Sequence, residues 1–206
     1  MMPRHDESAW GGPLEGAGEW VSLVPLEIAH EAGLVEAVKD GRIWTLWYAR
    51  VPSPEGMRAE IERRLDLAAK GRMQPFTVLD RDGRVVGMTS YQMLDPANRR
   101  VEIGYTWYAK SVQKTPLNTE AKLLLLRHAF ERLACIAVGF TTSTFNHPSR
   151  RAIERLGAKL DGILRNHSIL PDGTIRDTCY YSILESEWPA VKRHLQWKLE
   201  NYEMQK

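Results

Sequence analysis

The chain has 206 residues, of which 43% are hydrophobic and 26% are charged, a composition typical of a globular protein and not of a disordered chain. At a usual size of about 100–200 residues per domain, one domain is the simplest organisation. The 28 basic and 26 acidic side chains leave a formal net charge of +2, which is too balanced for the dense phosphate neutralisation of a nucleic-acid-binding protein, so we expect no direct nucleic-acid partner.

Cysteine usage and the chain ends indicate the compartment. Cys135 and Cys179 are far apart and have no metal-ligand spacing, so we expect neither a disulfide framework nor a metal site. A reducing, cytoplasmic location fits this pattern. Residues 1–18 lack the apolar core of a signal peptide, and no apolar run reaches membrane-spanning length, so we expect no membrane partner. We predict a flexible leader over residues 1–18, one domain over 19–200 and a tail over 201–206.

The first half of the chain alternates strand and helix patterns. A short apolar run predicts a strand over residues 21–26. Apolar residues at helical spacing predict amphipathic helices over 28–38 and 57–68. Two β-rich runs, 76–79 and 85–94, flank an Asp-Gly pair and predict a hairpin.

Residues 99–108 predict a strand with two different faces. Because strand side chains alternate, we expect Glu102, Gly104 and Thr106 to point the same way, with the glycine allowing close approach of a ligand such as a pantetheine arm. A carboxylate on this face could accept a proton from an amine if burial raised its pKa. The alternative is a solvated residue or an ion-pair partner.

The second half begins with the most apolar helix of the chain, over residues 117–133, which covers most of its circumference with leucine, alanine and phenylalanine and must be largely buried. The remaining predicted elements are a strand, a short helix, two strands around a Pro-Asp-Gly turn and a final helix, over residues 136–140, 148–156, 160–170, 174–184 and 188–199. Seven strands are therefore expected in all.

The start of the leucine-rich helix is a candidate phosphate site. The first N–H groups of a helix have no intrahelical acceptor and lie at the positive end of its dipole, which favours anions. Thr115 and Pro116 predict the helix start, and Lys114 adds a cation. The donors would be the amides of Leu117, Asn118 and Thr119. The alternative is a capped helix with a solvated lysine.

The turn before the predicted helix at residue 148 holds further polar residues. Capping and turn formation are the default roles of Asn146, His147 and Ser149. If the turn faces the same cleft as Glu102, Ser149 could protonate a leaving thiolate, and Tyr180 or Tyr181 could do so instead. Arg150 could contact an anionic cofactor or simply keep its helix face solvated. The absence of a G-x-S-x-G motif argues against a Ser-His hydrolase.

Three segments together resemble the GNAT superfamily. They are Glu102-Ile103-Gly104-Tyr105-Thr106-Trp107, Asn118-Thr119-Glu120-Ala121-Lys122-Leu123 and Asn146-His147-Pro148-Ser149-Arg150-Arg151-Ala152-Ile153-Glu154-Arg155-Leu156-Gly157-Ala158. The chain is most similar to the branch of ribosomal-protein N-terminal (alanine/serine) acetyltransferases, and the resemblance covers roughly residues 20–198.

The resemblance implies an α/β fold whose central mixed, mostly antiparallel sheet of about seven strands opens as a V between its fourth and fifth strands. Acetyl-CoA would lie in the V, and an unprotonated amine would attack its thioester directly. Glu102 matches the position of the base and Ser149 that of the acid. The cofactor contacts implied are main-chain groups of Tyr105, Thr106 and Trp107, the pyrophosphate loop from Lys114 and Thr115 to Leu117, Asn118 and Thr119, and Asn146, Ser149 and Arg150.

The pyrophosphate loop departs from the pattern of the superfamily. The usual Gln/Arg-x-x-Gly-x-Gly/Ala is replaced by Ser-Val-Gln-Lys-Thr-Pro over residues 111–116. Loss of glycine restricts the backbone from positive φ, and Pro116 removes an amide donor. We hypothesise that Lys114 offsets part of this loss as a point charge on phosphate.

The sequence therefore predicts transfer of an acetyl group from acetyl-CoA to a primary amine, either on a small molecule or at a peptide or protein N-terminus. The first alternative is a catalytically silent acyl-CoA-binding module, and the second is a fold that only mediates association. The acceptor pocket is expected between residues 44–54 and 165–174, where Trp44, Trp47 and Tyr48 could form an aromatic wall. The alternative for these three residues is a place in the core. Both a monomer and a homodimer are compatible with this prediction.

Overall fold

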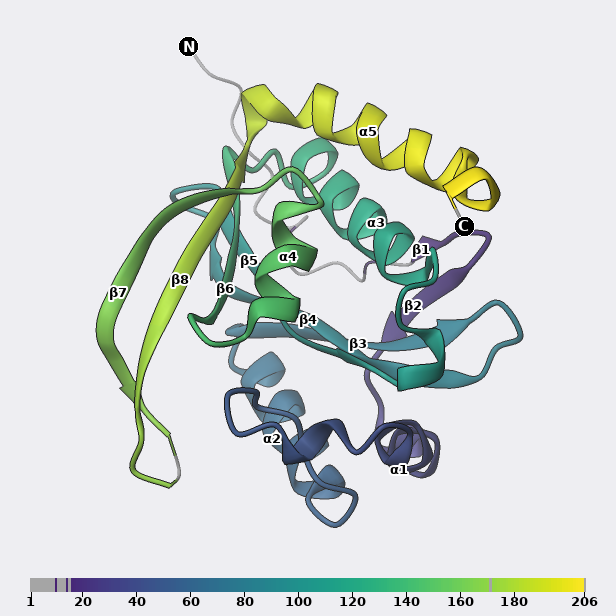
Figure 1. Ribbon diagram of the computed structural model, residues 1–206, viewed down its shortest axis with the longest axis vertical. Helices are drawn as coiled ribbons and strands as arrows, with labels where there is room; N and C mark the ends of the chain where they lie inside the picture. The colour runs from purple at the N-terminus through teal and green to yellow at the C-terminus, as the bar shows by residue number, and fades with distance from the viewer. Residues whose placement is uncertain (1–9, 11–13, 15, 171, 206) are drawn as a thin grey trace.

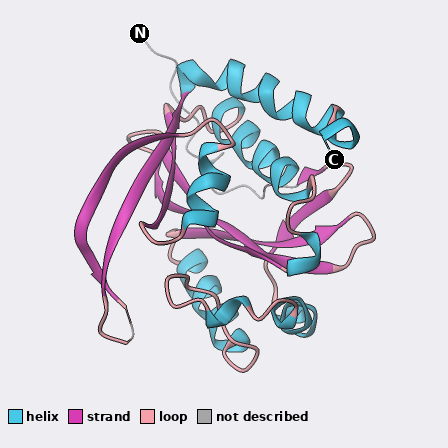
Figure 2. Cartoon of the chain, viewed as in Figure 1, coloured by secondary structure: helices cyan, strands magenta, loops and turns pink. Residues whose placement is uncertain are grey.

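A computed structural model describes residues 10, 14, 16–170 and 172–205 of the chain (Figure 1). One eight-stranded sheet runs through the molecule in the order β1-β2-β3-β4-β5-β6-β8-β7 (Figure 2). Its strands are β1 (Gly16–Ala17), β2 (Val21–Pro25), β3 (Met73–Asp80), β4 (Val85–Asp95), β5 (Arg100–Tyr108), β6 (Ala137–Ser143), β7 (Lys159–Ile169) and β8 (Ile175–Leu184). All seven predicted strands are present, and β1 is the additional one.

Helices cover both faces of the sheet (Figure 1). On one face lie α1 (Glu31–Lys39) and α2 (Met57–Ala69), and on the other lie α3 (Leu117–Glu131), α4 (His147–Glu154) and α5 (Trp188–Glu200). Short 3-10 turns connect or extend these elements: η2 (Ile28–His30), η3 (Ile43–Thr45), η4 (Lys110–Val112), η5 (Glu185–Glu187) and η6 (Tyr202–Gln205). The predicted α/β fold with one mixed, mostly antiparallel sheet is confirmed.

Each face of the sheet has its own hydrophobic core. The core under α3 and α5 includes Val101, Ile103 and Leu125, and the core under α1 and α2 includes Met88 and Trp107. Because α3 packs between the sheet and α5, most of its circumference is buried, as its leucine-rich sequence predicts.

The predicted leader over residues 1–18 falls mainly on residues outside the described part of the chain. Of its described residues, Trp10 and Leu14 are buried in the core under α3 and α5, and Gly16–Ala17 pairs with β2. The boundary of the domain near residue 19 stays a prediction. The predicted tail begins with Asn201 and the 3-10 turn η6.

The start of β2 is tied to the opposite layer by one carboxylate. Glu120 of α3 is buried, and its Oε1 accepts the Glu19 N–H at 2.9 Å. Its Oε2 accepts the N–H groups of Trp20 and Val21 at 2.6 and 3.0 Å. One carboxylate of α3 therefore satisfies three backbone N–H groups at the start of β2, about 100 residues away in the chain.

The sheet opens between β5 and β6. These two strands pair in parallel only at Arg100 with Ala137, Val101 with Val138 and Glu102 with Gly139. Beyond Glu102, β5 continues with β4 and β6 continues with β8. The predicted V is thus present, and its apex lies at Glu102.

A β-bulge corrects the predicted faces of β5. Tyr105 has φ +49°, and the register with β4 changes from Ser90–Gly104 to Met88–Trp107. The extra residue turns Thr106 toward α3, whereas Glu102 and Gly104 face the α1 and α2 side. The expectation that Glu102, Gly104 and Thr106 share one face is therefore wrong for Thr106, because strict alternation holds only for an unbulged strand.

Candidate active site

Glu102 lies at the apex of the V, where β5 and β6 part. Its carboxylate accepts a hydrogen bond from Gln92 Nε2 on β4 at 3.3 Å. Burial raises the pKa of Glu102, against the opposing effects of the Arg100 charge and of hydrogen bonds from Thr141 and Gln92. A carboxylate whose pKa is raised toward neutrality is a better proton acceptor at physiological pH than a solvated one.

Gly139 of β6 makes room for this side chain. A Cβ atom added at Gly139 would lie 2.9 Å from Glu102 Cγ, a distance too short for two carbon atoms. The Glu102 side chain therefore crosses the β5–β6 pair directly over the glycine backbone. Gly139, to which no sequence motif points, is needed for the position of the carboxylate.

The two tyrosines considered as proton donors point in opposite directions. Burial and the charge of Glu102 raise the pKa of Tyr180, so its hydroxyl stays protonated beside the carboxylate. Tyr181 faces the other core, where its hydroxyl donates to Glu154 Oε1 at 2.8 Å and accepts from Arg150 Nε at 3.0 Å. Tyr180 is therefore the tyrosine on the Glu102 side of the sheet.

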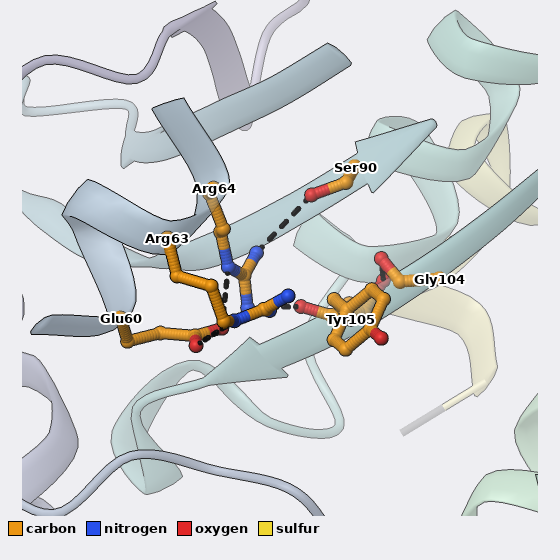
Figure 3. A network of polar contacts seen from close by, with 7 residues as sticks. Glu60, Arg63, Arg64, Ser90, Gly104 and Tyr105 are labelled. Carbon is orange, nitrogen blue, oxygen red and sulfur yellow. Dashed lines mark hydrogen bonds and ion pairs between the residues drawn. The ribbon is translucent and has the colours of Figure 1, made fainter. Parts of the chain in front are cut away.

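A buried arginine holds the bulge from the α2 side, as Figure 3 shows. Arg64 donates from Nη2 to the Tyr105 carbonyl oxygen at 3.1 Å and from Nη1 to Ser90 Oγ at 3.1 Å. Its Nε donates to Glu60 Oε1 at 2.8 Å, and Glu60 also binds Arg63. All three hydrogen bonds come from the buried, charged guanidinium of Arg64, which makes them strong. They hold Tyr105 in its left-handed conformation at the opening of the V.

A buried lysine holds the same bulge from the α3 side. Lys122 donates from Nζ to Thr106 Oγ1 at 2.8 Å and to Thr89 Oγ1 at 3.4 Å, and the two hydroxyls are themselves 2.8 Å apart. Burial lowers the pKa of Lys122 to about 7. The strand next to the opening is thus restrained from both faces of the sheet.

The predicted phosphate end of the site is the segment before α3. The helix begins at Leu117, with Asn118 and Thr119 in its first turn, so their N–H groups are available as helix-start donors. Thr115 Oγ1 donates to the Val112 carbonyl at 2.7 Å and accepts weakly from the Leu117 N–H at 3.4 Å.

Lys114 is exposed and has φ +63°, so the segment adopts a left-handed residue although glycine is absent. Asp40, which follows α1, makes two hydrogen bonds to this loop. Its side-chain Oδ2 accepts the Ser111 N–H at 2.8 Å, and its main-chain oxygen accepts the Lys110 N–H. The hydrogen bonds from Ser111 lower the pKa of Asp40.

The turn after β6 has the capping role that its sequence indicates. Asn146 Oδ1 accepts the Ser149 N–H at 3.1 Å and caps α4. Arg150 donates to the Tyr181 hydroxyl and to the Thr144 carbonyl, which occupies part of its guanidinium. The predicted roles of Asn146, Ser149 and Arg150 toward a cofactor stay predictions.

Exposed aromatic rings from two segments meet at the opening. Trp47, between α1 and α2, lies 5.4 Å from Phe145 of the turn after β6 and 5.6 Å from Tyr48, measured between ring centroids. Trp44 instead packs against the core under α1 and α2. Trp44 therefore follows the core alternative, and the role of Trp47 and Tyr48 in an acceptor pocket stays a prediction.

Two residues of the site were missed although the sequence carries a signal for them. Arg64 stands on the same helical stripe as Met57 and Ile61, both buried, and Lys122 directly precedes the leucine run of α3. A charged residue on an apolar stripe indicates a buried charge that needs partners. Among the described residues, no cluster of three or more potential metal ligands occurs.

Two further findings concern the described part of the chain. Cys135 and Cys179 are buried and free. None of its helices combines the length and the apolar character that crossing a bilayer requires.

Comparison with known proteins places this geometry in a family. Residues 21–159 match the acetyltransferase (GNAT) domain. The Bacillus subtilis protein YdaF, named as a ribosomal N-acetyltransferase, is 37% identical over 111 residues, which cover 54% of this chain and 60% of YdaF. The Escherichia coli ribosomal-protein-serine acetyltransferase is 25% identical over 162 residues, or 77% of this chain and 89% of that protein.

A solved structure extends the match over most of the chain. A GCN5-related N-acetyltransferase from Brucella melitensis is 34% identical and superposes with a TM-score of 0.79, covering 89% of this chain and 84% of that one. The chain therefore belongs to the GNAT acetyltransferase family, whose chemistry is the transfer of an acetyl group from acetyl-CoA to an amine.

Proposed function

We propose that the chain acetylates the α-amino group at the N-terminus of a protein, with a ribosomal protein as the first candidate. The observation that carries the proposal is the Glu102 carboxylate over Gly139 at the apex of the V, with a raised pKa and with Tyr180 beside it. The names of the Bacillus and Escherichia relatives support the choice of acceptor.

The exposure of two aromatic rings near the end of β6 favours a chain end as acceptor. Trp47 and Phe145 at this opening are 53% and 59% exposed. An extended N-terminus can pass such a surface and place only its terminal amine at the carboxylate. Aromatic rings add contact area for the following residues of the acceptor at a low cost in side-chain entropy.

The chemistry is a direct acyl transfer. The neutral amine attacks the thioester carbonyl and forms the new C–N bond, and the tetrahedral intermediate then breaks its C–S bond. Glu102 takes the proton lost by the amine, directly or through water. The thiolate of CoA receives a proton from Tyr180 or Ser149, and the raised pKa of Tyr180 keeps that donor protonated.

Cofactor placement follows the same proposal. Main-chain groups of Tyr105, Thr106 and Trp107 would pair with pantetheine, because β5 has lost its β6 partner there. The first turn of α3 and Lys114 would bind the pyrophosphate through helix-start amides and one positive charge. Asn146, Ser149 and Arg150 would complete the far side of the cofactor site.

The test is an acceptor screen that follows free CoA thiol. The enzyme and acetyl-CoA are offered synthetic peptides with a free N-terminus, the same peptides with a formylated N-terminus, and small amines including polyamines and free amino acids. We expect thiol release with free peptides and not with blocked ones, and mass spectrometry should locate the acetyl group on the α-amine. Turnover of small amines alone would refute the proposal, and acetyl-CoA binding without any turnover would indicate the silent module.

The base is tested separately. Replacement Glu102→Gln keeps the shape of the side chain and removes its basicity, so we expect a fall in kcat of about 100-fold or more. In the wild type, kcat should rise with pH through the raised pKa of Glu102, because only the ionised carboxylate accepts the proton. A Glu102→Gln enzyme with wild-type activity over the whole pH profile would exclude Glu102 as the base.

A further inference from the structure

Arginines gather around the Tyr105 side chain at the opening of the V. The Cζ atoms of Arg63 and Arg64 lie 5.0 and 5.4 Å from the centre of the Tyr105 ring (Figure 3). Arg176 approaches from β8, on the other side of the opening, and the Tyr105 phenol and the Arg50 charge both act on its guanidinium. Strand alternation puts Arg176 on the same face of β8 as Tyr180, the neighbour of Glu102.

Negative charge in this cluster is scarce. Glu60 is shared between Arg63, at 2.7 Å, and Arg64, at 2.8 Å. Within the described part of the chain, neither Arg50 nor Arg176 forms an ion pair with a carboxylate. Glu60 is therefore occupied by Arg63 and Arg64, and the ion pairs of the described residues leave the charges of Arg50 and Arg176 without a carboxylate partner.

The acidic side chains close to these arginines in sequence have other partners. Asp177 accepts the Asn166 N–H at 2.7 Å and, by alternation along β8, points away from the face of Arg176. Glu62 pairs with Arg58 at 2.6 Å. Neither carboxylate is therefore available to neutralise Arg176.

Arg176 also has an unused donor. Its Nε is buried and has no hydrogen-bond acceptor among the described residues, although nearly all buried polar groups in folded proteins are paired. Burial and then the charge of Arg50 lower the pKa of Arg176. An unpaired guanidinium N–H that also feels a second positive charge is a donor that an anionic ligand would satisfy.

We infer that Arg50 and Arg176, with Arg63 beside them, form a subsite for a carboxylate group of the acceptor. The inference rests on the proposed function, since it places this carboxylate in the same polypeptide as the acetylated amine. Tyr105 lies three residues from Glu102, which is at most roughly 10 Å along the strand because the bulge shortens it. An extended acceptor covers that distance in about three residues, so the favoured acceptors have aspartate or glutamate at position two or three.

The experiment compares matched peptide acceptors on the full chain with acetyl-CoA. One peptide has aspartate at positions two and three, and its partner has asparagine there. The variants are Arg176→Gln, Arg50→Gln and Arg176→Lys. The control is Arg193→Gln, an exposed arginine of α5 on the far side of the sheet.

For the wild type we expect kcat/KM to be about 10- to 100-fold higher for the aspartate peptide, since charge-assisted hydrogen bonds have that strength. Arg176→Gln and Arg50→Gln should remove most of this preference by raising the KM for the aspartate peptide. Their KM for acetyl-CoA and their rate with the asparagine peptide should stay unchanged. Arg176→Lys should keep part of the preference, and Arg193→Gln should keep all of it.

Equal rates for both peptides in the wild type, or a preference that survives in Arg176→Gln and Arg50→Gln, would overturn the subsite. If no peptide is acetylated, the proposed function fails and calorimetry decides the subsite alone. Tighter binding of the aspartate peptide to the wild type, lost in Arg176→Gln, then supports it. Equal binding of the two peptides overturns it.

Discussion

Replacement of Lys122 by methionine should remove a pH dependence from the stability of the fold. Lys122 is buried, and in the described part of the chain its ammonium group contacts two threonine hydroxyls and no carboxylate. Methionine has a similar unbranched shape and no charge. The hydrogen bond between Thr89 and Thr106, at 2.8 Å, remains possible in the variant.

The magnitude follows from proton linkage. Burial lowers the pKa of Lys122 in the folded chain from 10.5 to about 7. Between these two values the unfolded chain binds more protons than the folded chain, so the free energy of unfolding rises with pH. Below pH 7 both states are protonated and the penalty is constant. At about 1.4 kcal/mol per pKa unit, the full difference sets an upper limit of about 5 kcal/mol.

Urea unfolding followed by tryptophan fluorescence measures this effect from about pH 6 to about pH 10. The wild type should gain stability as pH rises, by up to about 1.4 kcal/mol per pH unit, relative to Lys122→Met. The control is Lys70→Met, which removes an exposed lysine from a surface ion pair with Asp66. A constant difference in stability between wild type and Lys122→Met over the whole range would refute the reasoning.

Three further changes test the site and its supports. Glu120→Gln should lower the free energy of unfolding by about 2–3 kcal/mol, because it weakens three charge-assisted bonds to the start of β2; an unchanged urea midpoint would contradict this role. Gly139→Ala should reduce kcat roughly 10- to 100-fold with little change in the KM for acetyl-CoA, because the new Cβ, 2.9 Å from Glu102 Cγ, displaces the carboxylate. A wild-type kcat in this variant would show that the position of Glu102 is not critical. Lys114→Ala and Lys114→Gly should both raise the Kd for acetyl-CoA about two- to fivefold if the charge binds phosphate, and the effect should shrink in high salt; an unaltered Kd in both variants rejects that role.

Local sequence patterns predicted most of the strands and helices correctly. All seven expected strands and five helices lie within a few residues of their predicted ranges, because strand alternation, helical stripes and turn residues are properties of neighbouring residues. Glu102 was a candidate because it matches a motif of the resembled family, whereas its place at the end of the β5–β6 pairing appears only in the structure. The expectation that the loss of glycine keeps the loop from positive φ is wrong, because Lys114 itself adopts the left-handed conformation.

Contacts between distant segments decided the rest. The bulge at Tyr105 depends on the register with β4 and on Arg64, which is 41 residues away in the chain, so no alternation rule for β5 alone could show that Thr106 faces α3. The same holds for Arg176 of β8, whose charge interacts with the Tyr105 phenol across the opening between β5 and β6. Residue patterns were thus enough to locate the elements, and the resemblance of three motifs to a family indicated the class of chemistry. The tertiary structure alone decided which charges share the opening, because burial and proximity arise only when the strands and helices pack together.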